Sequence, residues 1–459
     1  MVAIEIVVFT VICLMMGWRI VKDKLKIQIS AYLLFMVFLM SSLYSTIVYT
    51  MQDNSISFSP FAAVMVAMAA FSLSYHITYI KKVPNPVFER VDSHVAIPAQ
   101  FPIYPYKRLV RGMCAFCAIL LLIGTYRYRG LPPIAESLTA LLEGTLGTSS
   151  VTTLRENRFM LTKSHYFGGE YSGQGITKVL QNAGWPLLIS LAVLILLEYK
   201  KPRDVFRVML LGILALLYVA GDGTRAGVVI VLMSCVIAIT KYKKMNLTGL
   251  IKYGLIFLLL MILLSSVSSK QYYLFSDGLG LETLLDSVKH IIDRAIMGNS
   301  TNDIIAIEYV QDGLLDFQYG SLHLTQFLNA LPGASSYKNF SYMLGQMMGA
   351  GNTTYASTTY LAIAFVDFGY LGVFSLYFVL GLLLSAFQRR MDRQDANDLL
   401  SRAYIAAMTW KFGYLAYTGP ISGMVDIVAV FFLYRILRYL CGNLRYLRRS
   451  NYIGAPIRR

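Results

Sequence analysis

Residues 358–387 decide the fold class, because they form an apolar run of thirty residues. They read TTYLAIAFVDFGYLGVFSLYFVLGLLLSAF and contain one charged residue, Asp367. A helix needs about 20 apolar residues to cross a bilayer. The run is therefore long enough to span a membrane and too long for one straight span. Asp367, Gly369 and Gly372 mark where we expect the helix to break.

The rest of the chain has the same character. The 459 residues are 56% apolar and 14% charged, and their mean hydropathy is +0.56. This composition excludes a soluble enzyme and predicts an all-α polytopic membrane protein. We expect about eleven transmembrane helices, the first of them a span and not a cleaved signal, near residues 2–18, 29–49, 58–80, 109–126, 184–197, 205–220, 226–240, 250–268, 358–387, 399–417 and 423–440.

The charges predict the orientation of these spans. Six segments at one set of span ends carry 29 of the 41 Lys and Arg residues, and an even number of spans separates each from the next. Basic segments beside spans face the cytoplasm. The N-terminus should then lie outside and the C-terminus in the cytoplasm. Because the global charge of +16 is explained by topology, no nucleic-acid partner is expected.

This topology leaves two long outer segments, in which we expect the function to reside. The cytoplasmic segments are short, basic and without a Gly-rich phosphate loop, which excludes an ATP-driven pump. The predicted organisation is four spans in residues 1–126, a first outer loop in 127–183, four spans in 184–268, a second outer loop in 269–357, and three spans with a basic tail in 358–459.

A short turn, Gly221-Asp222-Gly223-Thr224-Arg225, precedes the seventh span at the outer boundary. The free N–H groups and the positive dipole end of a helix that starts here, together with the Arg225 guanidinium, would form an anion site. The alternative is a tight turn whose arginine extends to lipid headgroups. Because an outer Arg in a Gly-rich turn departs from the charge pattern, we favour the anion site. Asp222 is a candidate base.

The first outer loop holds a second candidate cluster. Arg155 and Arg158 are three residues apart, so on a helix they would share a face and could grip a phosphate. His165 and Tyr171 follow, in a run of aromatic and small polar residues that is typical of carbohydrate-binding surfaces. An amphipathic helix lying on the bilayer explains the same pattern equally well.

The second outer loop contains a third cluster. Arg294 lies within an apolar stripe at helical spacing and is interpreted either as a phosphate ligand or as one partner of a salt bridge. His323 is a candidate proton acceptor, although a single histidine is more often structural. The run Gly345–Thr354, which includes Asn352, is interpreted as a flexible lining loop. Among residues inside the spans, Lys411, Asp367 and Asp426 predict function or charge pairing.

These residues resemble the Wzy-type O-antigen or oligosaccharide repeat-unit polymerases, and above all the enterobacterial-common-antigen branch. The resemblance is carried by Gly223-Thr224-Arg225 at the head of an apolar helix, by Ile292-Asp293-Arg294 with the later Asp316-Phe317-Gln318-Tyr319-Gly320, and by Phe368-Gly369-Tyr370-Leu371-Gly372. It covers the length and architecture of the chain, through short motifs.

The resemblance implies a GT-C-like glycosyltransferase of the bacterial inner membrane that polymerises undecaprenyl-pyrophosphate-linked repeat units. Membrane lipid and a Wzz-type chain-length regulator would be its partners, and it would need no cofactor or metal. Arg225, Arg155, Arg158 and Arg294 would stabilise the pyrophosphate charge. Tyr171 and Asn352 would bind sugar, and His323, His165 or Asp222 would be the base.

Two other functions fit the same sequence. An O-antigen ligase would use the same chemistry to move a finished glycan onto a lipid core. A flippase or exporter of lipid-linked oligosaccharides would need a polar path through the spans and no base. The concentration of polar and cationic residues in the outer loops favours an enzyme over a flippase.

The charge pattern predicts which positions a membrane-impermeant thiol reagent reaches in intact spheroplasts. In a background without native cysteines, single cysteines at Ser149 and Ser335 should be labelled from outside. Cysteines at Asp395 and Ser450 should be labelled only after the membrane is broken, because they follow the basic ends of spans. Labelling of position 395 without labelling of position 335 would reverse the topology.

Overall fold

The computed structural model describes residues 5–13, 26–27, 29–52, 57–80, 105–143, 174–221, 225–243, 245–246, 300–330, 340–349, 356–392 and 398–442, with isolated positions between 248 and 259. Nearly all of these residues are helical. The labelled helices are α2 (Ala31–Gln52), α3 (Ser59–Ile80), α4 (Tyr106–Tyr128), α5 (Pro133–Leu142), α7 (Gln174–Tyr199), α8 (Pro202–Val219), α9 (Arg225–Tyr242), α13 (Ser300–Gln311), α14 (Ser321–Ala330), α15 (Phe340–Met347), α16 (Tyr360–Asp392), α17 (Leu399–Gly413) and α18 (Leu415–Leu440).

Six of the described helices are long and apolar enough to cross a membrane, namely α2, α3, α4, α7, α16 and α18. This confirms the all-α membrane class. Helices α8, α9 and α17 also lie where spans are predicted, with lengths of 18, 18 and 15 residues. Residues 5–13 of the first predicted span are described and helical, whereas the predicted span near residues 250–268 lies largely outside the described residues. The count of eleven stays a prediction.

Two helices, α7 and α18, begin well before the predicted spans. Helix α7 starts at Gln174, ten residues before the predicted span. Its buried Gln181 donates a hydrogen bond to the Leu120 carbonyl, 2.7 Å away, and accepts one from Trp185. Helix α18 starts at Leu415, with a break at Gly419. In α7 a tertiary hydrogen bond satisfies the polar Gln181, which lowers the apparent hydropathy of that stretch. In α18 the Ala416 carbonyl, before the break, accepts a hydrogen bond from the Tyr377 hydroxyl of α16 at 3.3 Å.

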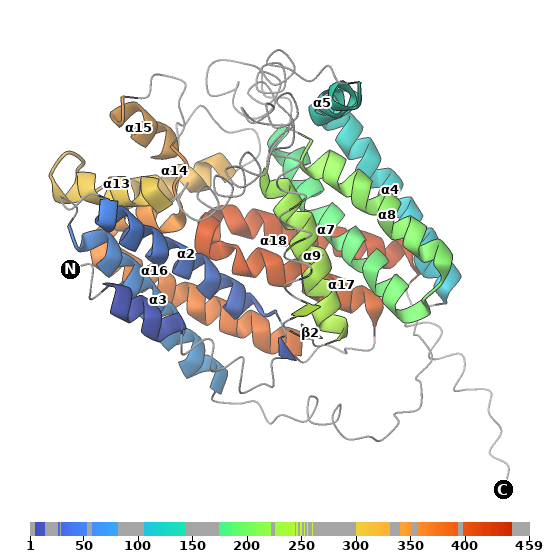
Figure 1. The fold of residues 1–459 in the computed structure, drawn as a ribbon, viewed down its shortest axis with the longest axis horizontal. Coiled ribbons are helices and arrows are strands. Elements are labelled where there is room, and N and C mark those ends of the chain that lie inside the picture. Colours follow the sequence, from blue (N-terminus) through green and yellow to red (C-terminus); the bar gives the residue numbers. More distant parts are fainter. Residues whose placement is uncertain are drawn as a thin grey trace, which may run out of the picture.

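The helices form two groups around α17 and α18. Helices α2, α3 and α16 pack together on one side, and α4, α7, α8 and α9 pack on the other (Figure 1). Helices α13, α14 and α15 lie together at one end of the first group. Helix α5 lies at the same end of the second group, so four helices that lie outside the six candidate spans share one end of the molecule.

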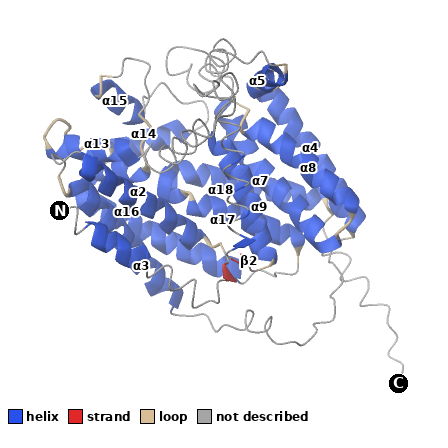
Figure 2. Cartoon of the chain, viewed as in Figure 1, coloured by secondary structure: helices blue, strands red, loops and turns tan. Residues whose placement is uncertain are grey.

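The opposite end carries the two strands of the described chain. Strand β1 (Lys26–Ile27) pairs antiparallel with β2 (Met245–Asn246), which appears as the short red element in Figure 2. Both strands border segments that the charge pattern places on one side of the membrane. The pairing requires these two segments to lie at the same end of the protein, which agrees with the charge-based topology.

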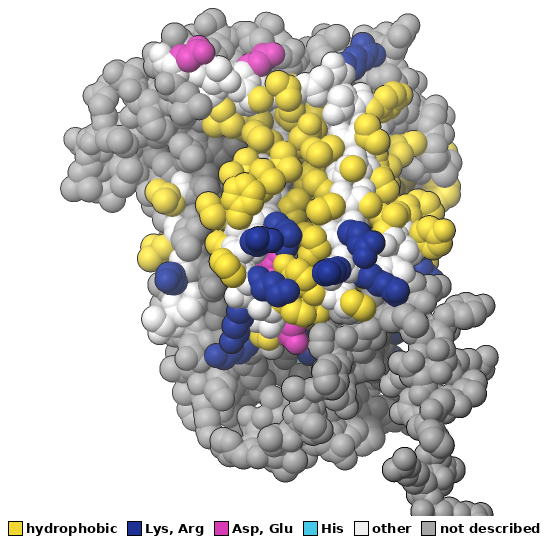
Figure 3. Space-filling view, turned by 90° about the vertical axis from the view of Figure 1, so that its right-hand side faces the viewer, with side chains coloured by type: hydrophobic (Ala, Val, Ile, Leu, Met, Phe, Trp, Pro, Cys, Tyr) yellow, Lys and Arg dark blue, Asp and Glu magenta, His cyan; other side chains and the backbone are white. Residues whose placement is uncertain are grey.

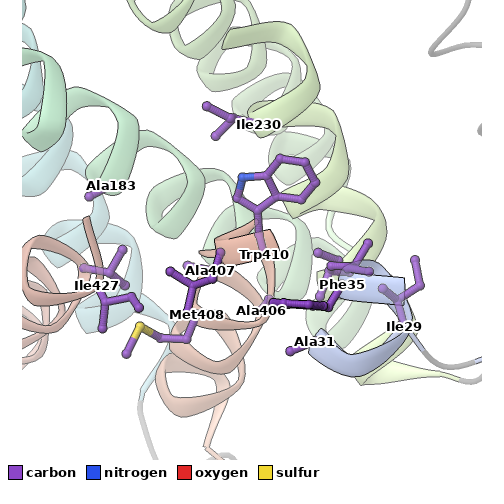
Figure 4. Close-up of a cluster of buried hydrophobic side chains, with 14 of the residues drawn as sticks. Ile29, Ala31, Phe35, Ala183, Ile230, Ala406, Ala407, Met408, Trp410 and Ile427 are labelled. Carbon is purple, nitrogen blue, oxygen red and sulfur yellow. The ribbon is translucent and has the colours of Figure 1, made fainter. Parts of the chain in front are cut away.

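Helix α17 is the centre of the packing. All its residues between Ala403 and Lys411 are buried, as expected for a helix that is apolar on every face. It packs against α2, α9 and α18. Trp410 points toward Ile230 of α9, and Ala406 lies near Phe35 of α2 (Figure 4). Helix α7 also packs against α17.

Helices α3 and α16 approach each other closely at Gly381. A Cβ atom at this position would lie 1.9 Å from Ser74 Oγ and 2.5 Å from the Phe71 carbonyl oxygen. The Phe71 oxygen belongs to the α3 backbone and cannot rotate away. Glycine at this position therefore sets the distance between the two helices.

We predict that Gly381→Ala lowers the free energy of unfolding by about 1–3 kcal/mol, because overpacking forces the two helices apart. Gly212→Ala on α8 is the matched control, since a Cβ there meets its nearest neighbour at 4.0 Å. The control should gain up to about 1 kcal/mol from helix propensity. Thermal unfolding in detergent measures both changes. Equal melting temperatures for the two variants would contradict the close approach.

Candidate functional site

The strongest candidate site lies where α16 breaks. Gly369 has a φ of 63° and a ψ of −153°, which interrupts the helix and confirms the predicted break. The carbonyls of Val366 and Asp367 accept hydrogen bonds from the N–H groups of Gln318 and Tyr319, each at 3.0 Å. The segment before α14 is thereby fixed to the broken turn.

Asp367 projects from this turn onto the start of α14. Its side chain is fully buried, and its carboxylate accepts hydrogen bonds from the N–H groups of Leu322 at 3.2 Å and His323 at 3.1 Å. It also accepts a hydrogen bond from the imidazole Nδ1 of His323. A negative charge at a helix N-terminus is favourable. Asp367 therefore caps α14 and orients the histidine on its first turn.

The other imidazole nitrogen faces Tyr360. With the proton on Nδ1 donated to Asp367, Nε2 accepts a hydrogen bond from the Tyr360 hydroxyl at 3.1 Å. Tyr360 is buried against Gly419, where α18 is broken. The His323 side chain keeps 15% of its surface exposed. Residues Tyr360, His323 and Asp367 form a hydrogen-bonded chain with one partly exposed member.

This chain matches the orientation of a general base. A carboxylate that accepts from Nδ1 fixes the imidazole tautomer and stabilises the imidazolium that forms after proton transfer. His323 could take a proton from a bound hydroxyl if that hydroxyl replaced Tyr360 at Nε2. The alternative is a purely structural link between α14 and α16, and the hydrogen bonds alone fit both roles.

A second buried carboxyl lies on α13, and the sequence interpretation missed it. Asp303 accepts hydrogen bonds from the Thr359 N–H at 2.7 Å and the Thr359 hydroxyl at 2.6 Å. The adjacent Asn302 donates to the Ser357 carbonyl at 2.7 Å. Burial raises the pKa of Asp303 to about 7, against the lowering effect of the Thr359 hydrogen bonds. An acidic residue directly before the apolar run Ile304–Ile307 was the available signal.

The intramembrane charges that the sequence singled out are paired. Lys411 is 3% exposed, and its ammonium donates to the Asp426 carboxylate at 2.5 Å. This ion pair joins α17 to α18. The prediction that these residues serve function or charge pairing is confirmed as pairing for Lys411 and Asp426, whereas Asp367 is hydrogen-bonded to His323.

Most of the other predicted site residues lie outside the described residues. Arg225 is the first residue of α9, but its side chain is not among those described. The remaining predicted positions outside the described part are Arg155, Arg158, His165, Tyr171, Asp222, Arg294 and Asn352. Their roles stay predictions.

The structure describes the surroundings of the turn before α9 and part of the predicted loop 345–354. The Gly221 carbonyl accepts a hydrogen bond at 3.0 Å from the N–H of Ile134 on α5. The start of α9 therefore lies at the end of the molecule that carries α5, as α14 does (Figure 1). The interpretation of residues 345–354 as a flexible loop was wrong for 345–347, which form the last turn of α15 because Leu344 and its neighbours pack into the small core beneath.

Among the described residues, no group of three His, Cys, Asp or Glu side chains could hold a metal ion. The chain was also compared with known proteins. No protein-family model, no curated protein and no solved structure matches it significantly.

The Asp303 carboxyl makes stability depend on pH. Its pKa rises from 3.8 to about 7 on folding, so the folded protein holds a proton that the unfolded chain releases. The stability from this group is therefore present below about pH 4 and is lost as the pH rises to about 7. We predict that Asp303→Asn, which mimics the protonated acid, loses this dependence.

Melting temperatures between pH 4 and pH 8 test the prediction. The difference between Asp303→Asn and the wild type should grow in favour of the variant as the pH rises, by an amount on the order of a few kcal/mol. Asp312→Asn is the control, because Asp312 is exposed near the end of α13. A constant difference for Asp303→Asn would show that the carboxyl does not titrate in this range.

Proposed function

We propose that this chain is a membrane-embedded glycosyltransferase that polymerises undecaprenyl-pyrophosphate-linked oligosaccharide repeat units. The observation that carries the proposal is the oriented His323–Asp367 pair, at the end of the molecule where α13, α14, α15 and α5 gather. Glycosyl transfer needs a base that accepts the proton of the attacking hydroxyl, whereas flipping of an intact lipid-linked sugar does not. The sequence resemblance supplies the substrate class.

In the proposed reaction, a hydroxyl of the incoming repeat unit attacks the anomeric carbon of the growing chain. A carbon–oxygen bond to the acceptor forms, the bond to the lipid pyrophosphate breaks, and the hydroxyl proton passes to His323 Nε2. Asp367 stabilises the resulting imidazolium. The growing glycan is thereby moved onto the new unit, and lipid pyrophosphate leaves with its negative charge.

The leaving group requires cationic stabilisation. Arg225 is the first candidate, because a guanidinium at the start of α9 would add to the free N–H groups and the positive end of that helix. We propose that Arg155, Arg158 and Arg294 contribute in the same way. The start of α9 and helix α14 lie at one end of the molecule, which is a requirement of this scheme.

The proposed function also implies in which membrane the protein lies and with which orientation. The apolar helices support a membrane-embedded protein. We propose the bacterial inner membrane, with α13, α14 and α15 on the outer side, since lipid-linked repeat units would be polymerised there. The charge pattern supports this orientation.

The direct test supplies the purified protein with lipid-linked repeat units and separates the products by size. A ladder of polymers, unaffected by a chelator, supports the proposal. Transfer of glycan only to an added lipid-linked core would indicate a ligase. Movement of intact lipid-linked units across liposomes, without new glycosidic bonds, would indicate a flippase. A strict requirement for a divalent cation would contradict the role of the arginines.

Variants of the proposed base, His323, and of the proposed pyrophosphate ligand, Arg225, test the mechanism separately. We predict that His323→Gln lowers the rate about a hundredfold or more, because the base is lost. His76→Gln is the control, since this partly exposed α3 histidine lies between Tyr32 and Tyr75 and should keep near wild-type activity. Normal polymer from His323→Gln at equal expression would assign His323 to structure alone.

Arg225→Ala should cost about 3 kcal/mol in the transition state, on the order of a hundredfold in rate. Arg225→Lys should recover little, because an ammonium lacks the planar fork that grips pyrophosphate. Arg129→Asn, at an exposed position with φ 54° at the end of α4, controls for loss of one positive charge. Full activity of Arg225→Ala would contradict the proposal that Arg225 binds the pyrophosphate.

A further inference from the structure

A dense row of cations lies at the end of the molecule opposite α5. Residues 105–111 and 198–207, which begin α4 and α8, contain seven basic residues and two acidic ones. Figure 3 shows a band of Lys and Arg side chains below a broad apolar surface on this face. We call this row the basic rim; its members are Lys107, Arg108, Arg111, Lys200, Lys201, Arg203 and Arg207.

Tyr106 organises the middle of the basic rim. The Lys201 ammonium lies 3.5 Å from the centre of its ring. The tyrosine hydroxyl accepts a hydrogen bond from Arg207 Nη1 at 2.5 Å and donates one to Asp204 Oδ1 at 2.6 Å. Arg207 also pairs with Asp204 at 2.6 Å. These contacts hold α4 against α8 and fix two cations beside one ring.

The two acidic residues of these segments offset only two of the seven positive charges: Glu198 is exposed, and Asp204 is buried. Its side chain is 2% exposed and its Oδ1 is committed to Arg207 and Tyr106. By contrast, Lys107, Arg111, Lys201 and Arg203 are exposed. The rim therefore presents an excess of positive charge to its surroundings, and an anion beside it would be stabilised.

An apolar stripe begins directly beside these cations. Phe206 is 68% exposed, Met209 61% and Ile213 55%. Their spacing of three and four residues places them on one face of α8. A ligand that contacts both the rim and the stripe must join a phosphate-like anion to a long apolar chain, since a free anion would leave the stripe unused.

We propose that the α4–α8 face binds an anionic phospholipid. Its phosphate lies among Lys201, Arg203 and Arg207, and its acyl chains lie along Phe206, Met209 and Ile213. Basic side chains beside a span attract anionic headgroups. This site is at the opposite end from α14, and it does not depend on the proposed polymerase activity.

The experiment measures binding of a fluorescent phosphatidylglycerol to the purified protein in detergent micelles. Unlabelled phosphatidylglycerol should displace it at a concentration at least tenfold lower than phosphatidylcholine, and added salt should weaken the binding. Equal displacement by phosphatidylcholine would overturn the proposal. Displacement by millimolar inorganic phosphate would show that the apolar stripe contributes nothing, and would overturn it also.

A matched pair of double variants locates the site. Lys201→Gln/Arg203→Gln should weaken phosphatidylglycerol binding about tenfold or more. Lys243→Gln/Arg390→Gln removes the same two kinds of charge from exposed positions after α9 and on α16, and should bind within twofold of the wild type. All four positions are exposed, so folding, checked by melting temperature, should be retained. Equal affinities for the two double variants would place the lipid elsewhere and overturn the proposal.

Discussion

The break of α16 at Gly369 is the constraint on which the candidate site depends. A helix inside a membrane satisfies its own backbone groups, and any interruption leaves carbonyls that must find partners within the protein. In this chain the partners are the N–H groups of Gln318 and Tyr319. That requirement brings the segment before α14 to the broken turn, and α14 follows it.

The position of His323 is a consequence of this arrangement. Once α14 starts beside the break, its free N–H groups face the Asp367 carboxylate, which accepts hydrogen bonds from two of them. The same carboxylate accepts a hydrogen bond from the imidazole Nδ1 of His323. A buried carboxylate without these donors would be costly. The contacts that stabilise the broken helix therefore also orient His323. Because part of the imidazole stays exposed, it can exchange a proton with a bound group.

The two ends of the molecule differ in which charged side chains are buried and which are exposed. At one end, acidic side chains such as Asp367 and Asp303 are buried and used to join helices α13 and α14 to α16. At the other end, Asp204 is buried while the surrounding cations stay exposed. The first arrangement gives defined sites for protons, and the second gives an open surface for anions. The proposed enzymatic and lipid-binding roles use these two ends separately.

The sequence by itself determined the class of fold, most of the helices and the break at Gly369. These features depend on local apolar length and on glycine, which a single chain reveals directly. It misplaced the starts of α7 and α18, where distant groups satisfy polar atoms: the Leu120 carbonyl accepts from Gln181, and the Tyr377 hydroxyl donates to the Ala416 carbonyl. Only the tertiary structure decided which charges meet. His323 and Asp367 are 44 residues apart, and Asp303 and Thr359 are 56 apart; such pairings follow from how helices pack, and no local pattern encodes them.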